Sequence, residues 1–123
     1  MSVRRLLFSR RFDVAALLLA GVLAYEGFHE LFLANYPRIL SPGSTWADPR
    51  LQFRFNAPTV AHLFMLVGGL ACVLLSAYGL QRRHAGQPVT EWSKRSQVAA
   101  LFTALLAYFV AIFHFVASAG AIG

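Results

Sequence analysis

A chain of 123 residues has room for one domain, and its composition excludes an ordinary soluble domain, because 58% of the residues are hydrophobic and only 13% are charged. The formal net charge of +6 does not indicate a nucleic-acid-binding protein, because most of the basic residues lie in two short segments that flank apolar blocks. The single cysteine, Cys72, excludes the membrane oxidoreductases that work with a pair of thiols.

Three apolar blocks cover residues 12–33, 57–80 and 98–122. Each block is longer than the roughly 20 residues that a helix needs to cross about 30 Å of hydrocarbon. We therefore predict an all-α integral membrane protein that forms a single membrane domain over residues 1–123. Its three transmembrane helices are expected at about 12–34, 57–81 and 96–121, with an outer loop at 35–56 and a cytoplasmic loop at 82–95.

The basic residues set the expected orientation of these helices. Eight of them lie before the first span or between the second and third spans, and three lie between the first and second spans. The positive-inside rule then places the N-terminus and the second loop in the cytoplasm and the C-terminus outside, in the inner membrane of a bacterium. The eight are Arg4, Arg5, Arg10, Arg11, Arg82, Arg83, Lys94 and Arg95, and the three are Arg38, Arg50 and Arg54.

The first span carries Glu26, His29 and Glu30 within an otherwise apolar run. A charged side chain costs roughly 2.5–3.5 kcal/mol at the centre of a membrane helix, so such residues usually face protein or water and have a function. All three fit within about 100° of the helix circumference. The opposite face is a stripe of small residues, so the acidic face either closes a site across a wider gap or meets another subunit. This stripe consists of Ala16, Ala20, Ala24 and Gly27.

Each later span also carries one histidine that continues a stripe of small residues. Since small residues let membrane helices approach closely, we expect both histidines at a helix interface. The stripes are Gly69, Cys72 and Ser76 with His62, and Ala100, Ala104, Ala107 and Ala111 with His114.

The three membrane histidines are expected at one depth. Counted at 1.5 Å per residue from the cytoplasmic end of each helix, His29, His62 and His114 lie about 24, 28 and 27 Å along their helices. The three imidazoles therefore form one layer in the outer leaflet, with Glu26 and Glu30 beside it.

Histidines and carboxylates at one depth suit a metal ion. Imidazole binds iron, copper and zinc, and a carboxylate adds a hard oxygen ligand. We predict Glu26, His29, Glu30, His62 and His114 as metal-binding residues, with iron or copper as the metal. Glu26 and His29 have the Glu-x-x-His spacing of dinuclear carboxylate sites, but one such motif does not complete a dinuclear site.

Three other cofactors are compatible with the same residues. In haem b binding, His62 and His114 would ligate the iron from both sides, with His29 as a further cofactor-binding residue. A bacteriochlorophyll needs a single histidine. Alternatively, Glu26 and Glu30 relay protons to a quinone near the outer face.

These features favour a small, non-catalytic subunit of a respiratory or photosynthetic membrane oxidoreductase complex that binds or contacts such a cofactor. The alternative is a cofactor-free accessory subunit whose acidic face and outer loop dock onto a larger membrane complex. A stand-alone membrane metalloenzyme is a third possibility, but so small a bundle has little room for a substrate pocket beside a metal. The expected partners are the larger complex and lipid, with no nucleic acid.

Overall fold

The computed structural model describes residues 2–34 and 57–122, and within these residues every regular element is a helix. Three helical stretches are long and apolar enough to cross a membrane, and together they confirm the predicted all-α membrane fold with three spans. The stretches are Arg10–Phe32, Val60–His84 and Glu91–Ala117. The elements in chain order are α1 (Val3–Leu7), α2 (Arg10–Phe28), the π-helical segment η1 (His29–Ala34), α4 (Ala57–His84) and α5 (Glu91–Ile122).

The helices differ from the expected ones chiefly around the predicted cytoplasmic loop. α4 continues to His84 and α5 already begins at Glu91, so the connection is 85–90 instead of 82–95. The basic residues expected in a loop, including Arg83 and Lys94, therefore lie on helices and are held in fixed positions. The predicted outer loop, 35–56, lies outside the described residues.

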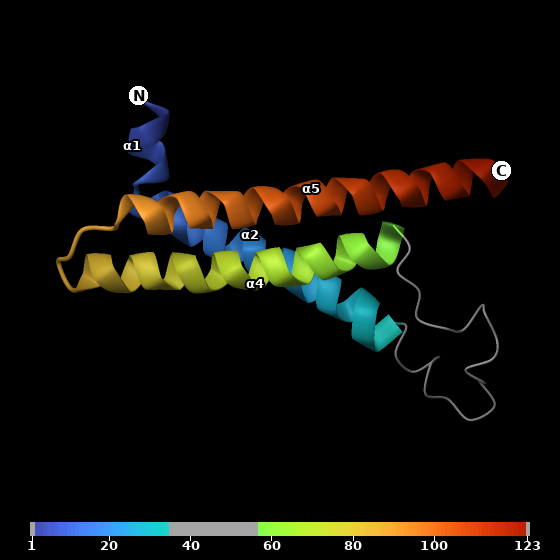
Figure 1. The fold of residues 1–123 in the computed structure, drawn as a ribbon, viewed down its shortest axis with the longest axis horizontal. Coiled ribbons are helices and arrows are strands. Elements are labelled where there is room, and N and C mark those ends of the chain that lie inside the picture. Colours follow the sequence, from blue (N-terminus) through green and yellow to red (C-terminus); the bar gives the residue numbers. More distant parts are fainter. Residues whose placement is uncertain (1, 35–56, 123) are drawn as a thin grey trace.

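α4 is the central helix of the bundle (Figure 1). It packs along the length of both α2 and α5, whereas α2 and α5 meet each other over only a short stretch. The small stripe predicted on the first span is buried, with Ala16, Ala20, Ala24 and Gly27 all turned inward. One face of α2 is thus used for packing, and its acidic face is available for a site.

Two glycines on α4 set how closely the helices approach. A Cβ added at Gly69 would lie 2.8 Å from the carbonyl oxygen of Ala20 on α2, and one added at Gly68 would lie 3.0 Å from the carbonyl oxygen of Ala100 on α5. Backbones that meet this closely leave no room for a larger residue, which is the packing that small residues permit between membrane helices.

The connection from α4 to α5 is a tight turn that follows from its sequence. Gly86 has a φ of 75°, a left-handed conformation that glycine adopts without the Cβ clash. The amide of Gln87 donates to the carbonyl of Arg82 at 2.8 Å and that of Gly86 to Arg83 at 3.1 Å, which is a Schellman cap. The Thr90 side chain then accepts from the Ser93 amide at 3.2 Å and begins α5.

The short helix α1 stands across the axes of the spans (Figure 1). The chain changes direction at Ser9, whose extended backbone ends one helix and whose hydroxyl caps the next by accepting from the Phe12 amide at 3.2 Å. If the three long helices cross a membrane, α1 lies along the membrane surface. We refer to the end of the bundle that holds α1 and the 85–90 turn as the basic end.

Candidate functional site

A cavity of about 320 Å³ lies between α2, α4 and α5, toward the end of the bundle that is remote from α1. We call it the acidic cavity. It forms because α2 and α5 separate in this half of the molecule while α4 remains between them (Figure 1). It is open to the surroundings, since Glu26 and Phe115 in its wall are both exposed. The cavity is lined by Glu26, Glu30, His62, Met65, Tyr108, Ala111, Ile112 and Phe115.

The acidic cavity brings together three of the five residues predicted as ligands. Glu26 comes from α2, Glu30 from η1 and His62 from α4, although they are up to 36 positions apart in the chain. Glu26 and Glu30 face α5 across this cavity, and contact of the acidic face with another subunit stays a prediction. Tyr108 of α5 adds a phenol that the sequence reasoning did not single out.

His29 lies beside the cavity but not in its lining. Its Nδ1 is 3.6 Å from Oε1 of Glu30, and its ring lies 6.1 Å from the ring of Tyr25. The side chain of His29 is 45% exposed. His29 is therefore a neighbour of the cavity residue Glu30, and cofactor or metal binding by His29 stays a prediction.

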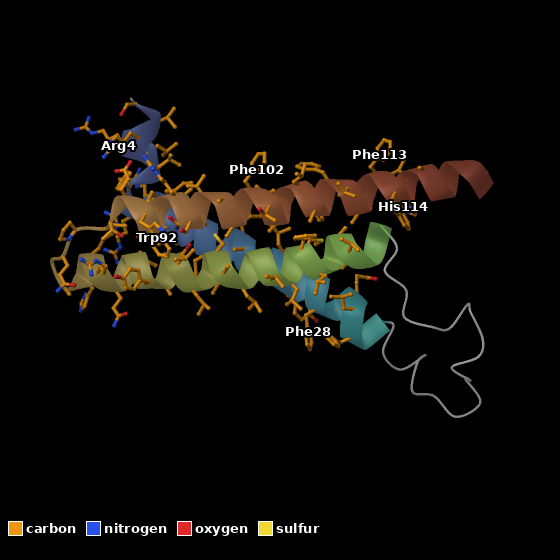
Figure 2. The ribbon with its side chains drawn as sticks, in the orientation of Figure 1. Arg4, Phe28, Trp92, Phe102, Phe113 and His114 are labelled. Atoms are coloured by element: carbon orange, nitrogen blue, oxygen red, sulfur yellow. The ribbon has the colours of Figure 1, made fainter. Side chains whose placement is uncertain are left out.

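His114 occupies a different position from the one expected. It lies near the C-terminal end of α5 (Figure 2), is exposed, and is not among the residues that line the acidic cavity. The expected burial of His114 in a helix interface is not seen in the described part of the single chain, where its side chain is exposed, and its role as a ligand stays a prediction. His62 and His114 therefore do not face one common cavity.

The predicted metal site requires ligand atoms that lie close enough together to coordinate one metal ion. In the part of the chain that the structure describes, no three His, Cys, Asp or Glu side chains are grouped so that they would hold a metal ion. Glu26 and Glu30 line the cavity from α2 and η1, and His62 lines it from α4. Metal binding by these residues stays a prediction.

The π-helical segment η1 begins between the two acidic residues that line the cavity. Residues 10–28 of α2 are α-helical, and the hydrogen-bonding pattern changes at His29. A π-turn widens the helix and shifts the direction in which the following side chains point, and such turns are frequent at functional sites. The change comes between Glu26 and Glu30, so it determines how the second carboxylate enters the cavity.

A second polar site lies at the basic end and is largely buried. The Asp13 carboxylate of α2, whose side chain is 1% exposed, accepts from Lys94 Nζ at 2.5 Å and from Arg83 Nε at 2.9 Å. Gln97 Nε2 donates to the same carboxylate at 3.0 Å and to Ser76 Oγ at 2.8 Å. We call these five residues, from three helices, the Asp13 cluster.

The surroundings of the Asp13 cluster satisfy its remaining donors. Arg83 also donates from Nη2 to the carbonyl of Phe8, which fixes the segment before α2. The Lys94 ammonium lies 5.1 Å from the ring centre of Phe12, within cation–π range. Gly79 leaves room for the carboxylate, since a Cβ there would lie 3.2 Å from Asp13 Oδ2. Every buried side-chain nitrogen or oxygen among the described residues has a hydrogen-bond partner. A network satisfied in this way ties the three spans together at one depth.

The sequence reasoning missed the Asp13 cluster. It assigned no role to Asp13 and took Lys94 and Arg83 as charges that set topology. The spacing contained a signal: Lys94 and Gln97 are three apart on one helix face, and Ser76 and Arg83 are seven apart on another.

Comparison of this chain with protein-family models, with curated proteins and with solved structures found no match. The function therefore has to be argued from the two polar sites themselves.

Proposed function

We propose that this chain is a small subunit of a membrane electron-transfer complex that binds a quinone-type ring compound in the acidic cavity. Quinones carry electrons and protons together within the membrane, so a quinone site would connect this chain to electron transfer. In this proposal the basic end faces the cytoplasm of a bacterium, in line with the positive-inside rule, and the acidic cavity lies in the outer half of the inner membrane.

The observation that carries the proposal is the combination of groups in one cavity. Two carboxylates, one imidazole and one phenol line a cavity whose remaining walls are Met65, Ala111, Ile112 and Phe115. Carboxylate and imidazole side chains within a membrane span are typical of proton pathways and of polar ligand sites. A quinone needs hydrogen-bond donors at its two carbonyl oxygens and proton donors when it is reduced. Glu26 and Glu30 provide both in their protonated form, and the imidazole of His62 and the phenol of Tyr108 provide further donors.

The size of the cavity favours a single ring. Its volume of about 320 Å³ is at the lower end of the range of roughly 300–1,000 Å³ for small-molecule pockets. A tetrapyrrole is larger than a quinone head group and would also require an axial ligand. His62 is the histidine in position to ligate haem or bacteriochlorophyll from this cavity, and a second axial histidine would have to come from elsewhere. Among the cofactors that the sequence allowed, quinone fits the cavity best.

The experiment that tests the proposal identifies the cofactors that copurify with the chain. Protein extracted in a mild detergent would be measured by absorption spectroscopy, by metal analysis and by mass spectrometry of its solvent extract. We expect a lipid-soluble quinone at a molar ratio near one, and reduction of that ratio in the variant Glu26→Leu/Glu30→Leu, which has no side-chain donor at either position. A Soret band, a pigment spectrum or one mole of iron or copper would contradict the quinone assignment and support the haem, pigment or metal predictions.

A second candidate function is favoured by the exposure of α5. Only 11% of the most apolar window of its membrane span is buried within the chain, against 33% for each of the other two spans. The side chains of Phe109, Phe113 and Phe115 are 63%, 76% and 74% exposed. This is the surface that a cofactor-free accessory subunit would present to a larger complex, since aromatic residues are enriched in protein interfaces.

Photocrosslinking distinguishes this second candidate from simple contact with lipid. A photoreactive amino acid would replace Phe113 on α5 or, as a control, Leu74 on α4, which is 70% exposed. An accessory subunit predicts a discrete protein adduct from position 113 and lipid adducts from position 74. Lipid adducts at both positions would contradict it.

A further inference from the structure

A groove of about 510 Å³ runs between α1 and α5 at the basic end, on the opposite end of the molecule from the acidic cavity. We call it the basic groove. Its floor is apolar, with Leu7 and Phe8 on one side and Val98, Ala99 and Phe102 of α5 on the other. Figure 2 shows Arg4 on α1 and Phe102 on the same side of α5. The polar residues of its lining are Arg4, Glu91, Lys94 and Arg95.

The polar rim of the basic groove carries an excess of positive charge. Three cationic residues and one anionic residue line it, which leaves two net positive charges. Adding the buried neighbours Asp13 and Arg83 does not change this balance, because their charges cancel. The two outer cations are accessible, since the side chains of Arg4 and Arg95 are 71% and 80% exposed.

The arginines on the rim are already oriented. Arg4 donates from Nη1 and Nη2 to the Glu91 carboxylate at 3.2 and 3.0 Å, and Arg95 Nη2 lies 3.7 Å from the same carboxylate. A guanidinium has five N–H donors, so each arginine retains donors for a further anion. Glu91 therefore holds two cations side by side at the mouth of the groove, a spacing that suits a phosphate group.

The depth of the groove matches the boundary between headgroups and acyl chains. α1 lies across the spans, and Trp92, which is 74% exposed at the start of α5, is a residue type that concentrates at the membrane interface. The cations thus sit at headgroup level, and the apolar floor runs from there into the hydrocarbon along α5. A soluble anion would use the rim but not the floor.

We propose that the basic groove binds one anionic phospholipid, with its phosphate on Arg4 and Arg95 and an acyl chain along Val98 and Phe102. Basic pockets between membrane helices are a known form of anionic-lipid site, with about 1 kcal/mol for each Lys or Arg near the surface. This site is separate from the acidic cavity and does not depend on what that cavity binds.

The test is native mass spectrometry of the full chain released from nanodiscs that contain equal amounts of phosphatidylglycerol and phosphatidylcholine with the same acyl chains. The wild-type chain is expected to retain one phosphatidylglycerol molecule in preference to phosphatidylcholine. Arg4→Gln/Arg95→Gln should lower that preference roughly 30-fold, the fold-change that corresponds to about 1 kcal/mol for each of two charges. The matched control is Arg10→Gln/Arg11→Gln, which removes two exposed charges outside the groove at the same end.

Each outcome decides the proposal. Loss of the preference in the groove variant and its retention in the control support the site. Equal losses in both variants, or equal retention of the two lipids by the wild type, would overturn it in favour of general surface charge. If the groove variant does not fold, Phe102→Ala takes its place: it keeps every charge, and unchanged phosphatidylglycerol retention in that variant would overturn the proposal.

Discussion

Asp13 on α2 and Lys94 on α5 form an ion pair of 2.5 Å between side chains that are 1% and 4% exposed. The two helices have few other contacts with each other, since each packs mainly on α4. The pair is completed by Arg83 of α4, so one carboxylate joins all three spans. The basic end of the bundle is thus closed by polar contacts, and the remote end is open enough to contain the acidic cavity.

Replacing Asp13 is expected to destabilise the chain strongly. Asp13→Ala leaves the buried Lys94 and the partly buried Arg83 without their carboxylate, and removal of one partner from a buried ion pair costs about 3–5 kcal/mol. We expect the free energy of unfolding to fall by about this amount. The measurement is reversible unfolding of the full chain in mixed micelles, followed by circular dichroism as the proportion of SDS rises.

The control for this variant is Glu91→Ala. Glu91 also accepts two hydrogen bonds from an arginine, but its pair with Arg4 is exposed, and exposed pairs contribute little to stability. In addition, Lys94→Met should cost less in the Asp13→Ala background than in the wild type, because the two residues interact directly. Equal losses from Asp13→Ala and Glu91→Ala would contradict the structural role of the Asp13 cluster.

The close approach of α2 and α4 predicts opposite effects for two glycines. In Gly69→Ala the new Cβ would lie 2.8 Å from the carbonyl oxygen of Ala20, so the helices must separate, and overpacking of this kind typically costs about 1–3 kcal/mol. In Gly21→Ala nothing lies within 4 Å of the new Cβ, and alanine stabilises a helix interior by up to about 1 kcal/mol relative to glycine. Unfolding titrations should show a lower midpoint for the first variant only. Similar midpoints would mean that α4 does not pack on α2 through Gly69.

The three spans could be predicted because membrane thickness imposes a length and a composition that are visible in the sequence. The small stripe of α2 could be predicted for a similar reason, because close helix packing requires small residues. The depth of the three histidines in the membrane was harder to predict. Their depth was counted at 1.5 Å per residue along uniform α-helices, whereas η1 departs from the α-helical repeat at His29 and α2 diverges from α5 toward this end of the bundle.

The Asp13 cluster shows a different limit of sequence reasoning. A lysine or arginine near the end of a span has two physical explanations, since it either selects the orientation of the span or neutralises a buried acid. Both explanations apply to Arg83 and Lys94. From the sequence, the positive-inside rule alone was sufficient to account for these two residues. The two explanations separate only when the helices are placed side by side, because burial of Lys94 depends on the positions of α2 and α4.

The two histidines of the later spans should behave differently toward the ligand of the acidic cavity. His62 lines the cavity and His114 does not, so His62→Ala should lower the amount of co-purified quinone several-fold and His114→Ala should leave it unchanged. The measurement is quantification of quinone per mole of protein in solvent extracts. Equal losses from the two variants would favour a cofactor held between both histidines, as in the haem prediction.

The most direct test of the account is a binding titration of the purified full chain, freed of endogenous quinone, with a short-chain benzoquinone. We predict saturable binding of one equivalent, and an affinity that falls roughly fivefold or more in Glu26→Leu/Glu30→Leu, because protonated carboxyl groups donate hydrogen bonds to the quinone carbonyl oxygens and each such bond contributes about 0.5–1.5 kcal/mol. Glu91→Gln, which removes an acid at the basic end, should bind as the wild type does. Absence of saturable binding, or equal affinities for all three proteins, would contradict the proposed quinone site in the acidic cavity.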